Sequence, residues 1–311
     1  MTLTQAERPL KITTPLGTDK LLIERFEGRE AICELFDFKV TVLFPTPLPP
    51  VPLVFDKLIG QSVTVDMIFP TDATPTMVSR YFNGIVLSIF EGEERASSTE
   101  GEGFLRYVLQ IVPTFSLLRH KTQSRIFQRM TVPKILDQII KTEGAITDYA
   151  NEVQGTFEER DYCVQYRESD FAFVCRLMEE EGIFWFFRHE DGKHTLVLAN
   201  ASTSHTAIPA PATITFGKPE GDVDVPLKRI KMLEKRQTIR AGNYTLWDHC
   251  FENVGEKYES KMKTLASVAV GTVTHKLNVA NDKLELYDYP GAFAQRFDGI
   301  NRDGGVQADK L

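Results

Sequence analysis

The sequence predicts a mainly β protein with α+β insertions, because strand-like runs lie on both sides of a helix-containing middle segment. Near the start, three runs have the composition and length of strands, at 62–69, 81–89 and 104–111. Turn-forming residues fill the loops between these runs, and no run of helical periodicity separates them. Parallel pairing needs such crossover helices, so antiparallel strands in a barrel or a sandwich are expected.

The first predicted helix begins at Pro133, because proline suits the opening turn of a helix. Gly144 is a suitable residue to close it. The apolar residues between them recur at helical spacing and predict one buried face: Val132, Ile135, Leu136, Ile139 and Ile140.

After a predicted strand at 162–166, a second helix begins at Ser169, a capping residue, and ends at Gly182. Asp170 suits the positive N-terminal end of this helix. Its apolar stripe has positions i, i+3, i+4 and i+7: Phe171, Val174, Cys175 and Met178. We therefore expect Phe171 and Val174 to be buried.

A hairpin is predicted next, because the runs 183–187 and 195–198 are aromatic or β-branched and flank Asp191-Gly192, a pair that favours tight turns. The stretch "RHEDGKH" within it resembles a zinc-peptidase motif, but its two histidines are five residues apart instead of four. In a two-residue hairpin, His189 opposes His194 and Glu190 opposes Lys193. A metal-dependent hydrolase using His189 and His194 is an alternative function, although two ligands are too few for zinc.

Strands return beyond about residue 205, where prolines at 209, 211, 219 and 226 indicate a domain junction. The expected strands are 212–216, 244–248, 268–275 and 284–287.

Two further stretches have alternative interpretations. The acidic run 179–181 closes the second helix, where negative charge opposes the helix dipole, so we expect Arg176 or a partner surface to offset it. Residues 44–52 contain five prolines and PxxP spacing. They are interpreted as a rigid loop between strands; the alternative function is a proline-motif adaptor.

Composition excludes several classes of protein. A net charge of −7 and the lack of basic runs with interleaved aromatics argue against nucleic acid as a partner. No apolar run reaches the roughly 20 residues of a membrane span, and the first residues have no Sec signal pattern. Cysteines at 33, 163, 175 and 250 lack CxxC spacing, which indicates reduced and mostly buried thiols. No catalytic, cofactor-binding or metal-binding residue is assigned.

The run "RDYCVQYRESDF" at 160–171, continued by "RLMEEEGI" at 176–183, resembles the VgrG family, the spike proteins of bacterial type VI secretion systems. Weaker matches come in the family's order across residues 10 to 295: "PLG" at 15–17, "FEGRE" at 26–30, "LIG" at 58–60, "FNGIV" at 82–86, "RIFQ" at 125–128 and "YDYPG" at 287–291. The family pattern continues into an OB-fold and a long β-helix that this sequence does not contain.

The resemblance implies a phage tail hub-like fold with two antiparallel β-barrel domains packed with a helix-containing segment. It implies three domains: a first barrel at 1–118, a helix-containing α+β domain at 119–205, and a second barrel with a small α/β part at 206–311. It also implies a non-enzymatic hub that adapts a hexameric Hcp-type tube to a trimeric spike. The implied partners are two further copies of the chain, the tube, baseplate components and secreted effectors. Assembly is expected in the bacterial cytoplasm, followed by export through the apparatus.

Overall fold

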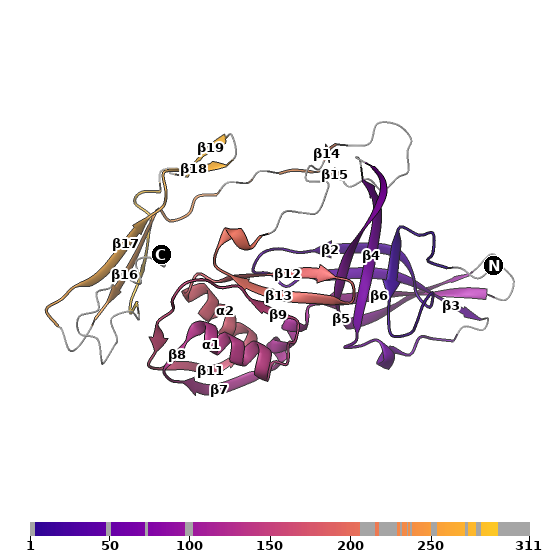
Figure 1. Ribbon diagram of the computed structural model, residues 1–311, viewed down its shortest axis with the longest axis horizontal. Coiled ribbons are helices and arrows are strands. Elements are labelled where there is room, and N and C mark those ends of the chain that lie inside the picture. Colours follow the sequence, from indigo (N-terminus) through magenta and orange to yellow (C-terminus); the bar gives the residue numbers. More distant parts are fainter. Residues whose placement is uncertain are drawn as a thin grey trace. The chain divides into compact units, whose positions relative to one another are not determined.

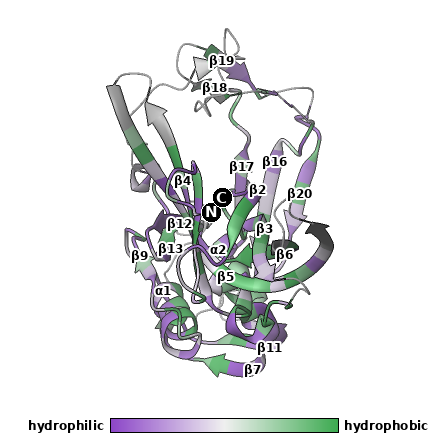
Figure 2. Ribbon diagram, turned by 90° about the vertical axis from the view of Figure 1, so that its right-hand side faces the viewer, coloured by the Kyte–Doolittle hydropathy of each residue, from purple (hydrophilic) through white to green (hydrophobic). Residues whose placement is uncertain are grey.

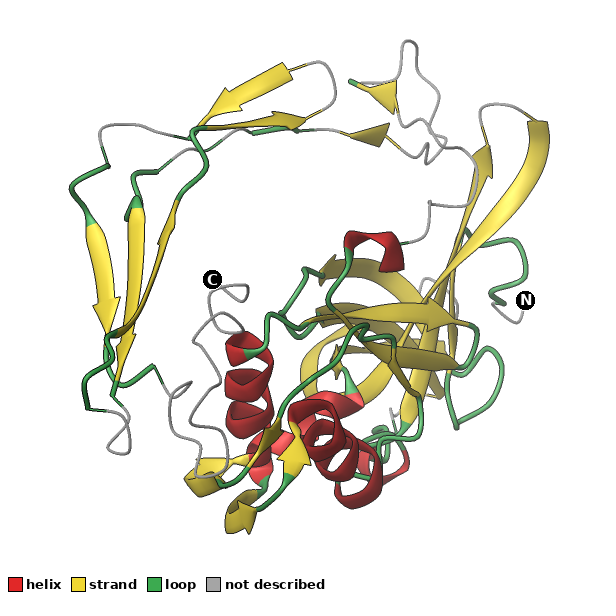
Figure 3. Ribbon diagram, turned by 60° about the vertical axis from the view of Figure 1, so that its left-hand side comes forward, coloured by secondary structure: helices red, strands yellow, loops and turns green. Residues whose placement is uncertain are grey.

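The computed structural model describes residues 4–47, 51–71, 74–96, 102–205, 215–217, 229–230, 232–234, 236, 238–249, 254–270, 273–277 and 281–291. The chain divides into two compact units, Met1–Met232 and Leu233–Leu311. Figure 1 labels elements of both units, and Figure 3 distinguishes helices, in red, from strands, in yellow. No described helix has the length and apolar character needed to cross a membrane.

A six-stranded sheet with the order β1-β4-β5-β6-β3-β2 begins unit 1, and every neighbouring pair in it is antiparallel. Its strands are β1 (Leu10–Thr13), β2 (Leu22–Arg29), β3 (Asp37–Pro47), β4 (Ser62–Thr71), β5 (Thr74–Ala96) and β6 (Glu102–Val112). The three predicted strands correspond to β4, β5 and β6, and the antiparallel prediction is confirmed. Hydrogen bonding among the described strands leaves this sheet open, so the two barrels stay a prediction.

The interpretation of residues 44–52 as a rigid loop is wrong for its first part, because β3 continues to Pro47. Pro45 pairs with Phe104 of β6, and Pro47 pairs with Glu102. The β2 strand pairs with β3 only as far as Leu43, so beyond that point β3 has only β6 as a neighbour among the described strands. Proline is tolerated in such an edge segment because its missing N–H is not needed by a second neighbour. Residues 48–50 lie outside the described residues.

Alternating side chains of this sheet, together with Phe36 just before β3, form the first cluster of buried apolar residues; Phe38, Val40, Tyr107 and Leu109 belong to it. In Figure 2, hydrophobic segments in green lie along β3 and β5. A 3-10 turn, η1 (Phe55–Lys57), follows the proline segment, and the Tyr107 hydroxyl accepts a hydrogen bond from the Leu53 backbone N–H at 3.0 Å. The cluster is what the period-2 pattern of the strands predicts.

The helix-containing part of unit 1 follows β6. Its helices are η2 (Thr114–His120), α1 (Val132–Asp137), which continues as a π-helical turn at Gln138–Glu143, and α2 (Asp170–Glu180). Its strands are β7 (Thr122–Phe127), β8 (Met130–Thr131), β9 (Tyr149–Asn151), β10 (Glu159–Arg160), β11 (Cys163–Ser169), β12 (Phe184–Glu190) and β13 (Lys193–Ala199). The strands pair as β7–β11, β8–β10 and β12-β13-β9. The second cluster of buried apolar residues lies here and includes Phe115, Ile135, Phe173, Leu177 and Trp185.

Both predicted helices are present, with one correction. All five predicted stripe residues of the first helix are buried, and Gly144 follows its last turn. In α2, Ser169 caps the helix by accepting from the Ala172 N–H at 3.1 Å. Val174 is fully buried as predicted, but Phe171 and Cys175 are only half-buried. The buried face is centred instead on Phe173 and Leu177, because the Phe173 ring stacks on Phe127 of β7.

Unit 1 ends with η4 (Ser202–Ser204) and the short parallel pair β14 (Thr215–Phe216) and β15 (Arg229–Ile230). Unit 2 contains a three-stranded sheet of β17 (Tyr258–Lys263), β16 (Asn243–Asp248) and β20 (Glu285–Asp288). The strand predicted at 268–275 is instead a hairpin of β18 (Ser267–Val270) and β19 (Val273–Lys276). The other strands expected here match β14, β16 and β20, and residues 212–214 lie outside the described residues. The domain boundaries at 118 and 205 stay predictions.

Candidate functional site

The β12–β13 hairpin is formed as predicted, with His189 opposite His194 and Glu190 opposite Lys193. The two-residue loop is Asp191-Gly192, and Gly192 has a φ of +76°, which glycine adopts without strain. Lys193 Nζ and Glu190 Oε2 form an ion pair of 3.1 Å. Side chains alternate between the two faces of the hairpin, so the two histidines share the opposite face from this pair.

His194 is buried, and both of its ring nitrogens have partners outside the hairpin. Its Nε2 accepts a hydrogen bond from the Thr114 backbone N–H at 3.0 Å, and its Nδ1 lies 2.7 Å from Asn83 Oδ1. Because Nε2 accepts, the proton must lie on Nδ1, from which it is donated to the amide oxygen. Burial and, secondly, the neighbouring His189 lower the pKa of His194 to about 4, so this imidazole is neutral at neutral pH.

His189 makes the complementary set of contacts. Its Nδ1 accepts from the Asn83 backbone N–H at 3.1 Å, and its Nε2 lies 2.9 Å from Glu30 Oε1. Since Nδ1 accepts, Nε2 carries the proton and donates it to the carboxylate. The other oxygen of Glu30 lies 3.5 Å from Arg80 Nη2.

Asn83 of β5 is the residue on which these contacts converge, and its side chain is 1% exposed. Its Nδ2 donates to Ser62 Oγ, the Val63 carbonyl and Thr64 Oγ1 at 2.8–3.1 Å, while its backbone N–H and its Oδ1 bind the two histidines. We call the cluster of Asn83, His189, His194 and Thr114 the joint. It connects the hairpin to β4 and β5.

Gly84, the next residue, is required by close packing. A Cβ at this position would lie 2.6 Å from Ile111 Cγ2 and 2.8 Å from the Val112 carbonyl oxygen. The sequence interpretation missed the roles of Asn83 and Gly84. The available signal was an Asn-Gly pair inside an otherwise apolar strand, where both residues are unfavourable unless a specific contact requires them.

Aromatic rings surround the joint. Phe36 lies edge-on to His194, with ring centroids 5.6 Å apart, and 4.9 Å from the ring of His189. The ring centroids of Phe38 and Phe82 lie 5.6 and 6.1 Å from that of His189. Phe187 of β12 packs against both the first and the second cluster. The polar contacts of the joint therefore lie in a low-dielectric setting, where hydrogen bonds are stronger and unpaired groups are more costly.

This arrangement does not support the metal-dependent hydrolase. All four ring nitrogens of His189 and His194 are engaged by protein groups, so neither imidazole offers a free lone pair. Among the residues that the structure describes, no group of three or more His, Cys, Asp or Glu side chains is placed to hold a metal ion. The two histidines are structural contacts.

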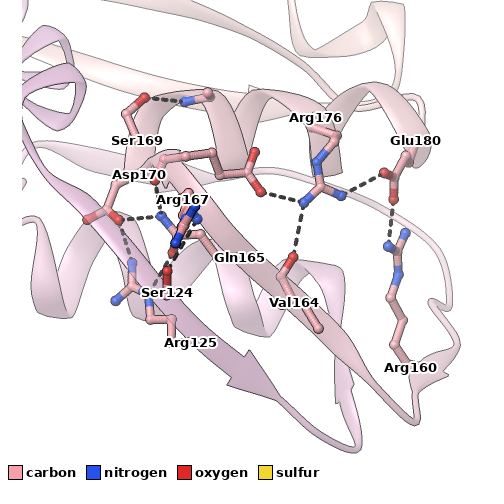
Figure 4. Close-up of polar contacts among 12 residues, drawn as sticks. Ser124, Arg125, Arg160, Val164, Gln165, Arg167, Ser169, Asp170, Arg176 and Glu180 are labelled. Atoms are coloured by element: carbon pink, nitrogen blue, oxygen red, sulfur yellow. Dashed lines mark hydrogen bonds and ion pairs between the residues drawn. The ribbon is translucent and has the colours of Figure 1, made fainter.

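A second polar network connects α2 to β7 and β11 (Figure 4). Arg125 of β7 donates to Gln165 Oε1 at 2.7 Å and to Asp170 Oδ1 at 2.6 Å, and Gln165 Nε2 donates to the same carboxylate oxygen at 2.9 Å. Asp170 and Gln165 are both fully buried. Arg125 also forms an ion pair with Glu143, at the end of the π-helical turn. This network fixes the N-terminal end of α2 on the β7–β11 pair.

The acidic end of α2 is offset by two arginines, as Figure 4 shows in part. Arg176, the residue expected to do this, lies 3.1 Å from Glu180, and Arg160 of β10 binds Glu180 at 2.6 Å and Glu181 at 2.8 Å. Burial opposes the charge of Arg160, but the two carboxylates outweigh it and raise its pKa. The carboxylates are thus used in ion pairs and are not arranged for acid–base chemistry.

The described cysteines are unpaired. Cys163 is buried and Cys175 half-buried, whereas Cys33 is exposed, contrary to the expectation of mostly buried thiols. Burial, followed by the charges of Glu179 and Cys33, raises the pKa of Cys175 to about 12, so this thiol is a poor nucleophile. Cys250 lies outside the described residues.

An open polar hollow lies beside the π-helical turn and is lined by Asp137, Gln138, Lys141, Thr142, Tyr149 and Asn151. The Tyr149 hydroxyl donates to Asp137 Oδ1 at 2.7 Å, and Asn151 Nδ2 donates to the same oxygen at 3.0 Å. Burial and this carboxylate raise the pKa of Tyr149. These contacts hold the parallel strand β9 next to the helix.

Comparison with known proteins identifies the family. The model of the phage tail baseplate hub family (GPD) matches residues 29–309. The type VI secretion system spike protein VgrG1a of Pseudomonas aeruginosa is 31% identical over 314 residues, covering 98% of this chain and 44% of that protein. VgrG1c of the same organism is 32% identical over 307 residues, covering 96% of this chain and 37% of that protein.

Among solved structures, a tail protein from Neisseria meningitidis MC58 superposes with a TM-score of 0.52 at 13% identity, covering 82% of this chain and 67% of that one. At this identity the likeness concerns the fold alone. The chain spans less than half the length of the two spike proteins cited. The family match and the near-complete coverage of this chain lead to one conclusion: the chain belongs to the phage tail baseplate hub family and is a relative of the VgrG spike proteins of type VI secretion systems.

Proposed function

We propose that the chain is a structural component of the spike base in a type VI secretion apparatus and has no catalytic role of its own. The observation that carries this proposal is the similarity to VgrG spike proteins over 98% of the chain. The polar constellations support it, because the histidines, the buried Asp170 and the acidic end of α2 are all engaged in contacts that hold elements together.

In this proposal three chains form a ring, and each chain contributes two β-barrel domains, at 1–118 and 206–311, beside the helix-containing domain at 119–205. A threefold object matches a sixfold tube over its whole face only if each chain presents two similar surfaces. The antiparallel six-stranded sheet supports the first of these domains. The ring adapts a hexameric Hcp-type tube to a threefold spike.

The further partners in this proposal are baseplate components and secreted effectors. Assembly takes place in the bacterial cytoplasm, and the spike then leaves through the apparatus toward the exterior or a target cell. The relatives named as type VI spike proteins support this route.

Electron microscopy of the chain mixed with its cognate hexameric tube protein tests the proposal. Threefold particles at tube ends are the expected result, and an unrelated hexameric ring of similar diameter is the control. Light scattering over a range of protein concentrations measures the mass of the chain alone, where concentration-dependent trimers are expected. A stable dimer, or tube-bound particles without threefold symmetry, would refute the hub role.

A further inference from the structure

We infer that the joint between the β12–β13 hairpin and β4–β5 is acid-sensitive, so that protonation of His194 opens it while each side keeps its own packing. This goes beyond the proposed structural role, because it assigns a conformational response to a defined contact inside unit 1.

The hydrogen-bond geometry makes the joint selective for neutral imidazole. The Thr114 backbone N–H points at His194 Nε2, from 3.0 Å. The Thr114 hydroxyl oxygen lies 3.1 Å from the same nitrogen and could accept a proton from it. A proton on Nε2 would nevertheless place the imidazole N–H against the Thr114 backbone N–H and would leave that backbone N–H without its acceptor. The same conflict arises at His189 Nδ1, which faces the Asn83 backbone N–H at 3.1 Å. A donor that faces another donor in a buried site loses its hydrogen bond and cannot regain one from water.

The surroundings of His194 do not compensate a positive charge. The elements packed against it contribute Asn83 from β5, Thr114 at the start of η2, the Phe36 ring, and Phe187 and His189 from β12. Of these, only His189 is titratable, and its ring centroid lies 6.4 Å away. The Glu30 carboxylate is bound to His189 instead, and its other oxygen faces Arg80. The neighbouring His189 itself opposes a positive charge on His194.

Each side of the joint has an independent core, so opening does not require unfolding of either side. Trp185, Leu196 and Leu198 of the hairpin belong to the second cluster, whereas Phe36, Phe38 and Phe82 belong to the first. Phe187 contacts both clusters and is the apolar bridge next to the histidines. The Phe36–Phe187 ring contact at 4.9 Å and the hydrogen bond from the Cys33 N–H to the Trp185 carbonyl at 2.9 Å also connect the two sides. Release of the polar contacts at the histidines therefore opens the joint locally and leaves both clusters packed.

The expected size of the effect follows from linkage. The pKa of His194 is about 4 in the closed joint and 6.5 for a free histidine. Relative to its value at high pH, the ratio of open to closed joint then rises by up to about 300-fold at low pH, and by about 80-fold at a pH near 4.5.

Amide hydrogen exchange measured by NMR on the whole chain tests this inference, because the Thr114 and Asn83 amides donate directly to the imidazoles. Protection factors, which remove the intrinsic pH dependence of exchange, are compared near pH 7 and near pH 4.5. Because the shift is already about 1.3-fold at pH 7, we expect a loss of protection of about 60-fold at Thr114 between the two conditions. Amides inside α2 serve as the internal reference and should keep their protection.

His194→Gln removes the titrating group and should make Thr114 protection independent of pH over this range. His120→Gln is the matched control, because His120 is exposed and lies outside the joint. Unchanged Thr114 protection in the original protein near pH 4.5, or an equal acid response in His194→Gln, would overturn the inference. If the variant does not fold, the imidazole ¹⁵N shifts of the unmodified protein decide. His194 should remain in the neutral Nδ1–H form as the pH falls from 7 to about 5, and titration near pH 6.5 would contradict the inference.

Discussion

Replacing Phe173 by alanine is expected to destabilise unit 1 far more than the same change at Phe171, two residues earlier on α2. Phe173 is fully buried, its ring stacks on Phe127 with centroids 5.7 Å apart, and the Arg176 guanidinium lies 5.2 Å from the ring centroid. Truncation would leave a cavity between α2 and β7, at a cost of roughly 3–5 kcal/mol.

Phe171 is only half-buried, although its ring contacts Phe115 at 5.1 Å and Arg119 covers it at 4.7 Å. Its truncation removes partial burial, worth roughly 1–2 kcal/mol, and leaves a site that water can fill. Urea unfolding followed by fluorescence, with the signal of the buried Trp185, measures both free energies of unfolding. Equal losses in the two variants, or a larger loss for Phe171→Ala, would show that the buried face of α2 has been placed wrongly.

Three further outcomes are expected. Gly84→Ala should cost roughly 1–3 kcal/mol in the same assay, because the added Cβ would meet Ile111 and the Val112 carbonyl. Gly255→Ala should be nearly neutral, because nothing lies within 4 Å of the added Cβ. Equal effects of the two changes would contradict the close packing at β5. Arg125→Met should lower the free energy of unfolding by roughly 3–5 kcal/mol, because it leaves the buried Asp170 carboxylate poorly compensated. A second change, Asp170→Asn, should recover part of that loss. If it recovers nothing, the arginine acts through packing and not through its charge. Protonation of His194 alone should lower the free energy of unfolding by up to about 3 kcal/mol as the pH drops from about 6.5 to about 4. The reason is that the histidine of the unfolded state takes up the proton at a higher pH than the buried one. A His194→Gln variant whose free energy of unfolding depends on pH as steeply as that of the original protein would refute this.

Local signals in the sequence predicted local structure well. Ser169, Gly182 and the apolar residues between them predicted α2, and Asp191-Gly192 predicted the hairpin with its pairing register. The burial of Phe171 was predicted wrongly because periodicity gives the width of an apolar stripe but not its centre. The centre depends on which neighbour packs against the helix, and here that neighbour is Phe127, 46 positions before Phe173 in the chain.

The joint was beyond prediction from sequence for a related reason. Asn83 and His194 are 111 residues apart, and Thr114 and His194 are 80 apart. No local pattern encodes such contacts, so the two histidines could be paired with each other but not with their true partners. The end of β3 was interpreted as part of a loop because its prolines are unfavourable in a central strand, and the sequence does not say where β2 stops pairing with β3.

The joint also gives the hairpin a means of discriminating among strand registers during folding. Successive side chains in a strand point to opposite faces, so a slip of one residue between β12 and β13 would take His189 out of line with His194 and turn one of the rings away from Asn83. The same slip would turn buried apolar side chains such as Trp185 or Leu198 to the other face, so the apolar pattern also opposes it. The three directional contacts, two to the buried Asn83 and one to the Thr114 backbone amide, add a further requirement, because they can form in only one register. A misaligned hairpin would therefore fail to dock on β5 and would remain free to rearrange. In this way the two histidines help to select the native register of β12 and β13.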